Sequence, residues 1–400
     1  MIEKSLLKKI IEEYGSPSFV FDEVELVDRV SKIKDIFSRD GRFVKLCYSI
    51  KANPFLIESL DSVIDNYEVC SPGELEICIS KKVSPEKIIY SGVNKGIDDV
   101  KRAIDYGVGT LTAESVRHYQ FIKKYSSEIR KKVSVILRLT SNSQFGMSEK
   151  DIDFIINDCL TAGADSFVCI DGIHYFNGTG RKKIEHQAKE LRSLIEYIKA
   201  LRDRFNIELP KLEYGPGLYH PYFEGEDFSD TLKPAKDLAP FLFDALDYCD
   251  LTVEMGRFFA SSCGYYITEI VDIKESGEKK WCIADGGLNH VNYLGQMMGM
   301  KIPKLLHYSD GTFIETDEED KEYCYTICGS LCTTNDVLIR DLKSGKLSIN
   351  DFLIFRNIGA YSVTEGIGLF LSRTLPKIIL CRENDCRVLR DFVDSWKINM

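Results

Sequence analysis

The sequence predicts a (β/α)8 TIM barrel followed by an antiparallel β-barrel or sandwich domain. Between about residues 43 and 257, short apolar runs alternate with polar segments whose apolar residues recur three and four apart. Strands that alternate with helices pair in parallel through crossover connections. Eight such units in about 215 residues fit a closed barrel better than an open, doubly wound sheet, which stays as the alternative.

The expected barrel strands are the apolar runs of this region, and the segments between them are expected to be helices. "GIDDVKRAIDYG" (96–107) is one such segment, with the apolar spacing of a helix that packs on a sheet. In chain order the eight expected strands are 43–50, 67–70, 87–92, 109–113, 133–139, 168–176, 211–215 and 250–256.

The pattern changes after Arg257. The segment "CGYYITEIVDIKESGEKKWCIADGG" reads as two strands joined by a turn at Gly277, and later apolar runs continue as short strands without long helices. We therefore expect a barrel over residues 26–258, and a β domain formed by residues 1–25 together with 259–400.

The charge and the apolar content exclude several classes of partner. The formal net charge of −10 argues against nucleic acid and against an anionic membrane, since both favour a basic face. No apolar run approaches the roughly 20 residues that span a bilayer. The first 15 residues read as a charged amphipathic helix without the apolar core of a signal peptide, so we expect a cytoplasmic protein.

Thirteen cysteines are expected to be mostly reduced and buried in such a compartment. Cys324, Cys328 and Cys332 stand four residues apart, which fits no common zinc pattern. We expect no metal site.

Polar residues stand where the predicted strands end, which is the face of a (β/α)8 barrel that carries function. Lys51 follows the first strand and Arg138 ends the fifth; the sixth to eighth strands run into "HYFNGTG" (174–180), "GPG" (215–217) and "EMGR" (254–257). Each taken alone is ordinary, as a solvated charge, a turn or a surface ion pair. Their joint position on one face indicates a site.

The chemistry of these residues matches pyridoxal 5′-phosphate. Glycine amides together with the hydroxyl of Thr179 and the guanidinium of Arg257 would bind a phosphate. Lys51 would form a Schiff base if its surroundings favour the neutral amine, and Glu254 would pair with a protonated ring nitrogen. The chain has no GxxxxGK[ST] motif and no GxGxxG after a strand, so nucleotide cofactors are less well supported.

With these residues placed, the sequence resembles the fold-type III pyridoxal-phosphate enzymes of the ornithine/diaminopimelate decarboxylase family over nearly its whole length. The resemblance implies an alanine racemase-like barrel joined to a β domain, and a head-to-tail homodimer with shared active sites. The matching motifs are "YSIKANP" (48–54), "EVCSPGELE" (68–76), "IIYSGVNK" (88–95), "GIHYFNGTG" (172–180), "EYGPGLY" (213–219), "EMGRF" (254–258), "DGGLNH" (285–290), "GSLCTTND" (329–336) and "GAYS" (359–362).

The resemblance also implies residue roles. Lys51 corresponds to the Schiff-base lysine, Glu254 to the partner of the ring nitrogen, and Cys332 to a cysteine that acts at Cα across the dimer interface. Glu68, Glu74 and Arg138 correspond to positions that shape the cofactor's surroundings. The implied phosphate ligands are Thr179, Gly215, Gly217, Arg257 and Tyr361.

Three departures from the family pattern bear on the substrate. Phe176 stands where a histidine commonly stacks on the cofactor ring, while His174 lies two residues earlier and reads as structural. Pro216 replaces the central glycine of the phosphate loop and removes one N–H donor. Thr333 stands where an acidic residue often binds the distal amine of the substrate, which weakens free ornithine, lysine or diaminopimelate as substrates.

These departures, with "SQFGMSEKD" (143–151) and "FLSRTLP" (370–376), are most similar to a specialised-metabolism subgroup. Its members decarboxylate amino-acid units with bulky acyl groups, either carrier-protein-bound glutamate or a siderophore intermediate. Thr333 and Arg373 are the expected substrate-binding residues. The alternatives left open are a free diamino-acid decarboxylase, an amino-acid racemase, a silent pyridoxal-phosphate-binding homologue and a (β/α)8 hydrolase.

Overall fold

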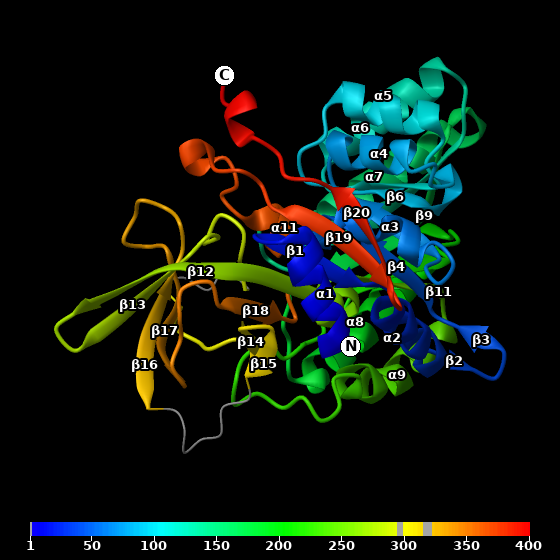
Figure 1. The fold of residues 1–400 in the computed structure, drawn as a ribbon. Coiled ribbons are helices and arrows are strands. Elements are labelled where there is room, and N and C mark those ends of the chain that lie inside the picture. Colours follow the sequence, from blue (N-terminus) through cyan, green and yellow to red (C-terminus); the bar gives the residue numbers. More distant parts are fainter. Residues whose placement is uncertain (1, 294–298, 315–321) are drawn as a thin grey trace. The chain divides into compact units, whose positions relative to one another are not determined.

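The computed structural model describes residues 2–293, 299–314 and 322–400. Eight parallel strands close into a barrel in the order β10-β11-β4-β5-β6-β7-β8-β9. Figure 1 labels β4, β6, β9 and β11 of this barrel. All eight strands lie on the runs predicted from the sequence, so the predicted barrel is confirmed. The strands are β4 (Lys45–Ser49), β5 (Asn66–Val69), β6 (Ile88–Tyr90), β7 (Thr110–Ala113), β8 (Val133–Arg138), β9 (Val168–Phe176), β10 (Lys211–Gly215) and β11 (Asp250–Met255).

Side chains from alternate strands fill the barrel. Cys47 of β4, Ile89 of β6 and Ile136 of β8 pack together, although none of these strands are neighbours. Such contact is possible only across the inside of a closed barrel, where inward residues from alternate strands share a layer. The residues two positions further along the strands therefore point to the C-terminal mouth.

Helices follow the strands, and their ends carry recognisable caps. In α5 the Asp99 carboxylate accepts the N–H of Gly96 at 2.8 Å, and Gly107 ends the helix at φ 91°. Val100, Ala103 and Ile104 form the buried face of that helix. The helices of this region are α2 (Glu23–Ile36), α3 (Ile57–Leu60), α4 (Pro72–Ser80), α5 (Ile97–Tyr106), α6 (Val116–Glu128), α7 (Glu149–Ala162), α8 (Ile184–Phe205), α9 (Lys233–Leu246) and α10 (Arg257–Ala260).

The β-rich part contains a ten-stranded sheet whose path runs β15-β14-β18-β12-β1-β19-β20, with β13, β16 and β17 extending from β12. The predicted hairpin around Gly277 is confirmed, because β12 and β13 pair antiparallel on either side of it. The strands and helices are α1 (Lys4–Tyr14), β1 (Ser18–Asp22), β12 (Gly264–Ser276), β13 (Lys279–Ala284), β14 (Leu305–Ser309), β15 (Thr312–Ile314), β16 (Tyr323–Cys328), β17 (Val337–Ser344), β18 (Phe352–Arg356), α11 (Ser362–Glu365), β19 (Lys377–Arg382) and β20 (Asp385–Arg390).

Two strand pairs of this sheet are parallel, in contrast to the antiparallel pattern of the rest. β1 lies between β12 and β19 and pairs in parallel with β19, and β13 pairs in parallel with β16 (Figure 1). The N-terminal helix α1 buries Leu7 and Ile10 in the same apolar cluster as Val20 and Ile354. Residues 2–22 are thus built into the β-rich part.

The chain divides into two compact units. One comprises residues 1–28, 221–229 and 259–400, and the other residues 29–220 and 230–258. The boundaries 26–258 and 1–25 plus 259–400 stay a prediction of how the chain splits into domains that fold independently.

Eleven of the cysteines are free, and Cys381 and Cys386 form a disulfide between β19 and β20. Most thiols are therefore reduced in the structure, but the free ones are less buried than predicted, since Cys169, Cys324 and Cys332 are exposed. In the described ranges, no helix combines the length and the apolar character needed to cross a membrane.

Burial of His290 predicts a loss of stability in mild acid. Its Nδ1 lies 2.9 Å from the Tyr266 hydroxyl, its Nε2 lies 3.0 Å from the Asn289 amide, and burial lowers its pKa from 6.5 to about 4. Between these values the unfolded chain binds a proton that the folded chain does not, so the free energy of unfolding falls as pH falls. The loss is on the order of 3 kcal/mol by pH 4.

Thermal unfolding of the wild type and of His290→Gln, followed by circular dichroism from pH 7 to 4, checks this expectation. The variant should show a shallower fall in Tm, and His186→Gln, at an exposed histidine of α8, should keep the wild-type slope. Equal slopes in all three proteins would contradict it.

Candidate active site

Lys51 stands at the C-terminal mouth of the barrel, in the turn that follows β4. Its Nζ donates to Glu68 Oε2 at 2.6 Å and lies 3.5 Å from Glu254 Oε1. The lysine side chain is 37% exposed, whereas those of Glu68 and Glu254 are 4% and 6% exposed. The structure thus joins three of the predicted residues in one partly open cluster, with the amine reachable and the carboxylates buried.

Glu254, on β11, is held by donors from two other strands. Ser49 Oγ donates to Oε1 at 2.9 Å, and His174 Nε2 lies 3.0 Å from Oε2. Burial by itself would raise the pKa of Glu254, but the Lys51 ammonium, the His174 imidazole and the Ser49 hydroxyl together lower that pKa below its usual value. The carboxylate therefore stays ionised inside the barrel.

Glu68 is fixed by the start of the next helix. The Cys70 thiol donates to Glu68 Oε1 at 2.8 Å, and the Cys70 N–H donates to Glu74 Oε2 at 2.6 Å. Ser71 caps α4 by accepting the N–H of Glu74 at 3.1 Å. Glu74 thus tightens the strand-to-helix turn that carries Glu68, which is consistent with a position that shapes the surroundings of the site.

Arg138 ends β8, and its Cα is the register partner of His174 on β9. Its Nη1 donates to Glu114 Oε1 at 2.7 Å, and the guanidinium carbon lies 4.8 Å from the centre of the Phe145 ring. Glu114, which follows β7, was not predicted. The two residues thus form a mostly buried ion pair at the ends of β7 and β8.

The loops after β9 and β10 touch backbone to backbone. Gly217 has φ +59°, and a Cβ there would lie 1.9 Å from the carbonyl oxygen of Gly178. The N–H of Arg181 donates to the Gly217 carbonyl at 2.9 Å, and the buried Gln187 amide donates to the Pro216 carbonyl at 3.2 Å. Only glycine allows this approach at 217, which explains the second glycine of "GPG".

Glu190 of α8 joins the loop after β9 to strand β10. The two terminal nitrogens of Arg181 donate to the Glu190 carboxylate at 2.8 Å. The Asn177 amide donates to it at 2.7 Å and the Tyr214 hydroxyl at 2.9 Å. The loops are therefore ordered by the protein itself. Thr179, predicted as a phosphate ligand, is exposed between Asn177 and Arg181.

Phe176 and Arg257 complete the predicted residues of the barrel mouth. The Phe176 ring lies against Gly215, where a Cβ would come within 2.4 Å of it. Arg257 begins α10 and is 9% exposed. A Cβ at the preceding Gly256 would lie 2.7 Å from that of Ala52, so the end of β11 packs on the segment that carries Lys51.

The other predicted residues lie in the β-rich unit. Cys332 is exposed and Thr333 half-buried in a turn whose Leu331 N–H is held by the Asp336 carboxylate at 2.7 Å. Arg373 donates to the Ser330 carbonyl at 2.7 Å, which ties it to this turn. Tyr361 precedes α11 with φ 69°.

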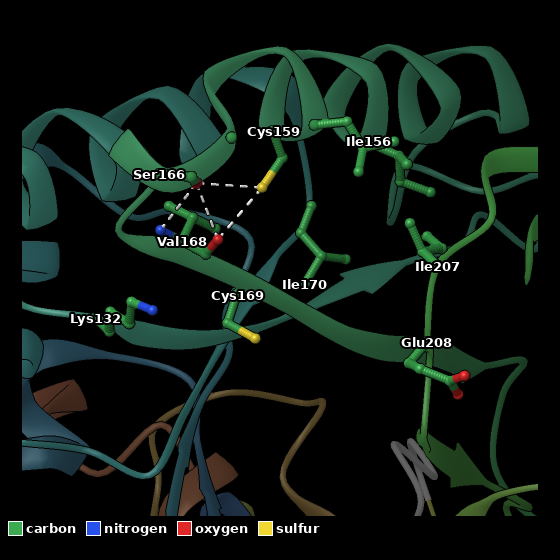
Figure 2. Close-up of a pocket in the computed structure, with 11 residues that line it drawn as sticks. Lys132, Ile156, Cys159, Ser166, Val168, Cys169, Ile170, Ile207 and Glu208 are labelled. Carbon is green, nitrogen blue, oxygen red and sulfur yellow. Dashed lines mark hydrogen bonds between the residues drawn. The ribbon is translucent and has the colours of Figure 1, made fainter.

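A cavity of about 340 Å³ lies elsewhere on the barrel unit, between α7, the start of β9 and the segment before β10 (Figure 2). Three of its polar groups contact one another: the Cys159 thiol lies 3.3 Å from both Ser166 Oγ and the Val168 carbonyl. It is at the N-terminal ends of the strands, the face of such barrels that rarely carries catalysis.

Several residues of the cluster were missed from the sequence. His174 was predicted to be structural rather than catalytic, and its contact with Glu254 leaves that prediction open; Ser49, Cys70 and Glu213 were not singled out as site residues. Cys70 stands two positions after Glu68 within the predicted strand 67–70, so the period-2 alternation of strands was a usable signal for it, whereas Lys51 lies in the turn after β4 and gives no such signal for Ser49. His174 and Glu213 could be placed only from the strand register.

The residues present fit pyridoxal phosphate. A reachable amine, an ionised buried carboxylate and a glycine-built cradle open at the same end of the strands, and they are the three features that the group requires.

Comparisons with known proteins agree with the fold and the fit. Residues 24–261 match the family described as "Pyridoxal-dependent decarboxylase, pyridoxal binding domain". The crystal structure of diaminopimelate decarboxylase from Methanocaldococcus jannaschii in complex with L-lysine superposes with a TM-score of 0.83 at 21% identity, over 97% of this chain and 92% of that one.

Two relatives with other names align over nearly the whole chain. "L-glutamyl-[BtrI acyl-carrier protein] decarboxylase" of Niallia circulans is 24% identical over 97% of this chain and 94% of its own. "2-[(L-alanin-3-ylcarbamoyl)methyl]-2-hydroxybutanedioate decarboxylase" of Staphylococcus aureus is 22% identical over 94% of this chain and 97% of its own.

Replacing Gly217 with alanine should weaken cofactor binding. The new Cβ would meet the Gly178 carbonyl at 1.9 Å and would force the loop apart. We expect at least about a tenfold loss of pyridoxal phosphate affinity, measured by absorbance titration of the apoprotein. Gly178→Ala is the matched control: its φ is also positive, at +87°, but its Cβ would meet open space. Equal affinities for the two variants would show that the contact between loops is unimportant.

Proposed function

Because the chain belongs to the pyridoxal-dependent decarboxylase family, we propose that it removes the α-carboxylate of an amino-acid unit that carries a bulky acyl or carrier-protein group. The observation that carries this proposal is Thr333, a neutral residue directly after Cys332. A free diamino acid would bring a distal ammonium into the site, and an ammonium without a charged partner is costly to desolvate.

The family fixes the cofactor and the type of reaction. The cofactor is pyridoxal phosphate, and the reaction is the decarboxylation of an amino acid. The finer proposal is supported by the relative named for carrier-protein-bound glutamate and by the one whose name joins an alanine unit to a larger hydroxy acid. Diaminopimelate decarboxylases are relatives as well, so a free diamino acid is the second candidate.

The proposed roles follow from the geometry of the barrel mouth. When bound, pyridoxal phosphate supplies an electron sink for the pair left behind as CO2 departs. Lys51 is the amine that would hold it, and Glu68 orients that amine through the 2.6 Å contact. Glu254 would keep a proton on the ring nitrogen, since Ser49 and His174 hold its carboxylate ionised.

The phosphate would lie at the loops after β9 and β10. Gly215 and Gly217 keep the backbone clear of side chains, while Thr179, Arg257 and Tyr361 would supply a hydroxyl, a guanidinium and a phenol. Phe176 would face the ring; it can stack but cannot donate a proton, so it contributes shape without charge. Arg138, bound to Glu114, would border the cofactor's surroundings.

We propose a cytoplasmic homodimer in which each site is completed across the interface. Cys332 of the partner subunit would return the proton to Cα. Thr333 and Arg373 would meet the tail of the substrate, and Arg373 is fixed to the Cys332 turn through the Ser330 carbonyl.

Release of CO2 from matched substrates tests the function. We expect glutamyl-carrier-protein or citryl-linked diamino acids to exceed free ornithine, lysine and diaminopimelate by about 30- to 150-fold in kcat/KM, since an unpaired buried charge costs on the order of 2–3 kcal/mol. Thr333→Asp should narrow the gap by restoring a charged partner. Fastest turnover of free diaminopimelate would contradict the proposal.

Mixing two inactive variants tests the shared site. Lys51→Ala and Cys332→Ser should each lose activity, because each removes one half of every site. When the two variants pair at random, about half of the dimers are hybrids. Each hybrid carries both changes in one site and leaves the other site intact, so the mixture should regain roughly a quarter of wild-type activity. Mixing Lys51→Ala with Glu254→Gln is the control and should regain none, since both residues belong to the same side of the site. Equal behaviour of the two mixtures would contradict the dimer.

A further inference from the structure

Glu213 is a buried carboxyl group that the mechanism above does not use. It lies on β10, two residues before Gly215, and is 2% exposed. Both of its oxygens are buried without an N–H or O–H donor, which is unusual for a glutamate. Its Cα is the register partner of His174 on β9, so the two side chains stand next to each other on the inside of the barrel.

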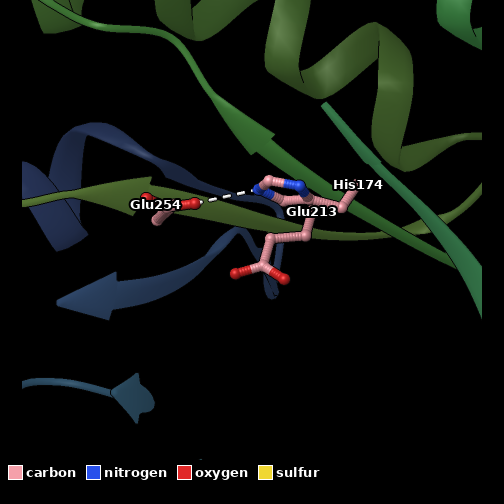
Figure 3. A group of neighbouring side chains, drawn as sticks. All are labelled: His174, Glu213 and Glu254. Carbon is pink, nitrogen blue, oxygen red and sulfur yellow. Dashed lines mark hydrogen bonds and ion pairs between the residues drawn. The ribbon is translucent and has the colours of Figure 1, made fainter. Parts of the chain in front are cut away.

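The charged neighbours of Glu213 come from every strand around it. His174, Glu213 and Glu254 bring one ligand atom each within 4.8 Å of one another (Figure 3). Glu68 on β5, the Cys47 thiol on β4 and the Lys51 ammonium also act on it. On the other side, a cavity of about 250 Å³ at the N-terminal ends of the strands reaches Glu213 and carries Lys45, Glu86, Lys211 and Asp250.

Three buried carboxyl groups therefore share the Lys51 ammonium. Like charges this close cannot all ionise at low dielectric, so one group must hold a proton. Glu254 has Ser49, His174 and Lys51 as partners, and Glu68 has Lys51 and Cys70. Glu213 has only the Cys47 thiol as a hydrogen-bond partner and no contact with Lys51, Ser49 or His174 among the hydrogen bonds and ion pairs of the described residues, so the proton belongs on it.

The electrostatics of the cluster point the same way. Burial raises the pKa of Glu213 well above the usual glutamate value, and the charges of Glu254 and Glu68 add to the rise against the opposing effect of Lys51. The pKa of Glu254 moves in the opposite direction. The pKa values of the two groups thus move in opposite directions, which leaves Glu213 as a neutral acid and Glu254 as a carboxylate.

We propose that Glu213 is a positioning residue that acts through Glu254: as the neutral acid of the cluster, it confines the negative charge of the inner barrel to the carboxylate that faces the cofactor. The inference rests on the proposed role of Glu254. If Glu213 ionised, the second charge would draw a proton onto Glu254 and would remove the partner of the ring nitrogen.

The same three side chains have the composition of a metal site, but their geometry favours hydrogen bonding. His174 Nε2 is directed at Glu254 Oε2, and the Lys51 ammonium already offers that carboxylate a positive charge. A metal ion would have to displace both contacts. Zn²⁺ alone therefore serves as a probe in the test.

Infrared spectra of the apoprotein at neutral pH test the protonation state directly. The wild type should show the carbonyl stretch of a buried protonated carboxylic acid, and Glu213→Gln should lose that band. Glu208→Gln, at an exposed glutamate, is the matched control and should keep it. If the amide variant does not fold, Glu213→Leu, which lacks polar atoms, takes its place. Survival of the full band in the Glu213 variant, or its loss on adding stoichiometric Zn²⁺ to the wild type, would overturn the proposal.

The pH profile of the holoenzyme tests the link to Glu254. The alkaline limb of kcat should lie about one pH unit or more higher in Glu213→Gln than in the wild type, because the amide cannot lose a proton. Coinciding alkaline limbs would overturn the proposal. The infrared result needs no substrate, so it stands even if the proposed decarboxylation fails.

Discussion

The contact between Lys51 and two buried carboxylates constrains the whole barrel mouth. Glu68 and Glu254 are almost completely removed from water, and a buried carboxylate persists only where donors or a cation compensate it. β4 and the turn after it supply both, through Ser49 and Lys51, while β9 supplies His174. Strands β4, β9 and β11 must therefore keep their register, since a slip by one residue would turn Ser49, His174 or Glu254 to the outside of the barrel.

This constraint also explains how the site can be both stable and reactive. The carboxylates are buried but matched, whereas the amine that matches them is partly exposed. If Lys51 held a cofactor, its nitrogen would no longer be a free ammonium group that donates to both carboxylates. Ser49 and His174 hold Glu254, and the Cys70 thiol holds Glu68, without depending on Lys51, and a neutral acid at position 213 would keep the remaining charge low.

Much of the fold could be predicted from the sequence because its signals are local. The alternation of apolar runs with helical segments marked all eight barrel strands, and the turn at Gly277 marked the hairpin. The place of β1 between β12 and β19 could not be predicted, because those strands lie more than 240 residues away along the chain. The same holds for the site: Lys51 and Glu254 stand at strand ends that a reader can find, but the contact of His174 with Glu254 depends on register and closure. Phe176 and Thr333 could be recognised as departures, yet their effect depends on a substrate that the chain alone does not contain.

The carboxylate of Glu190 has a thermodynamic consequence for ligand binding. By collecting donors from Asn177, Arg181 and Tyr214, it fixes the loop after β9 to β10, and the bond from the Arg181 N–H to the Gly217 carbonyl extends this order to the loop after β10 before any phosphate arrives. The conformational entropy of these loops is therefore lost when the chain folds and not when the cofactor associates. Folding and cofactor binding are therefore coupled through Glu190. A change that loosens the N-terminal part of α8 would let these loops move in the apoprotein, and cofactor binding would then have to order them, which lowers the affinity.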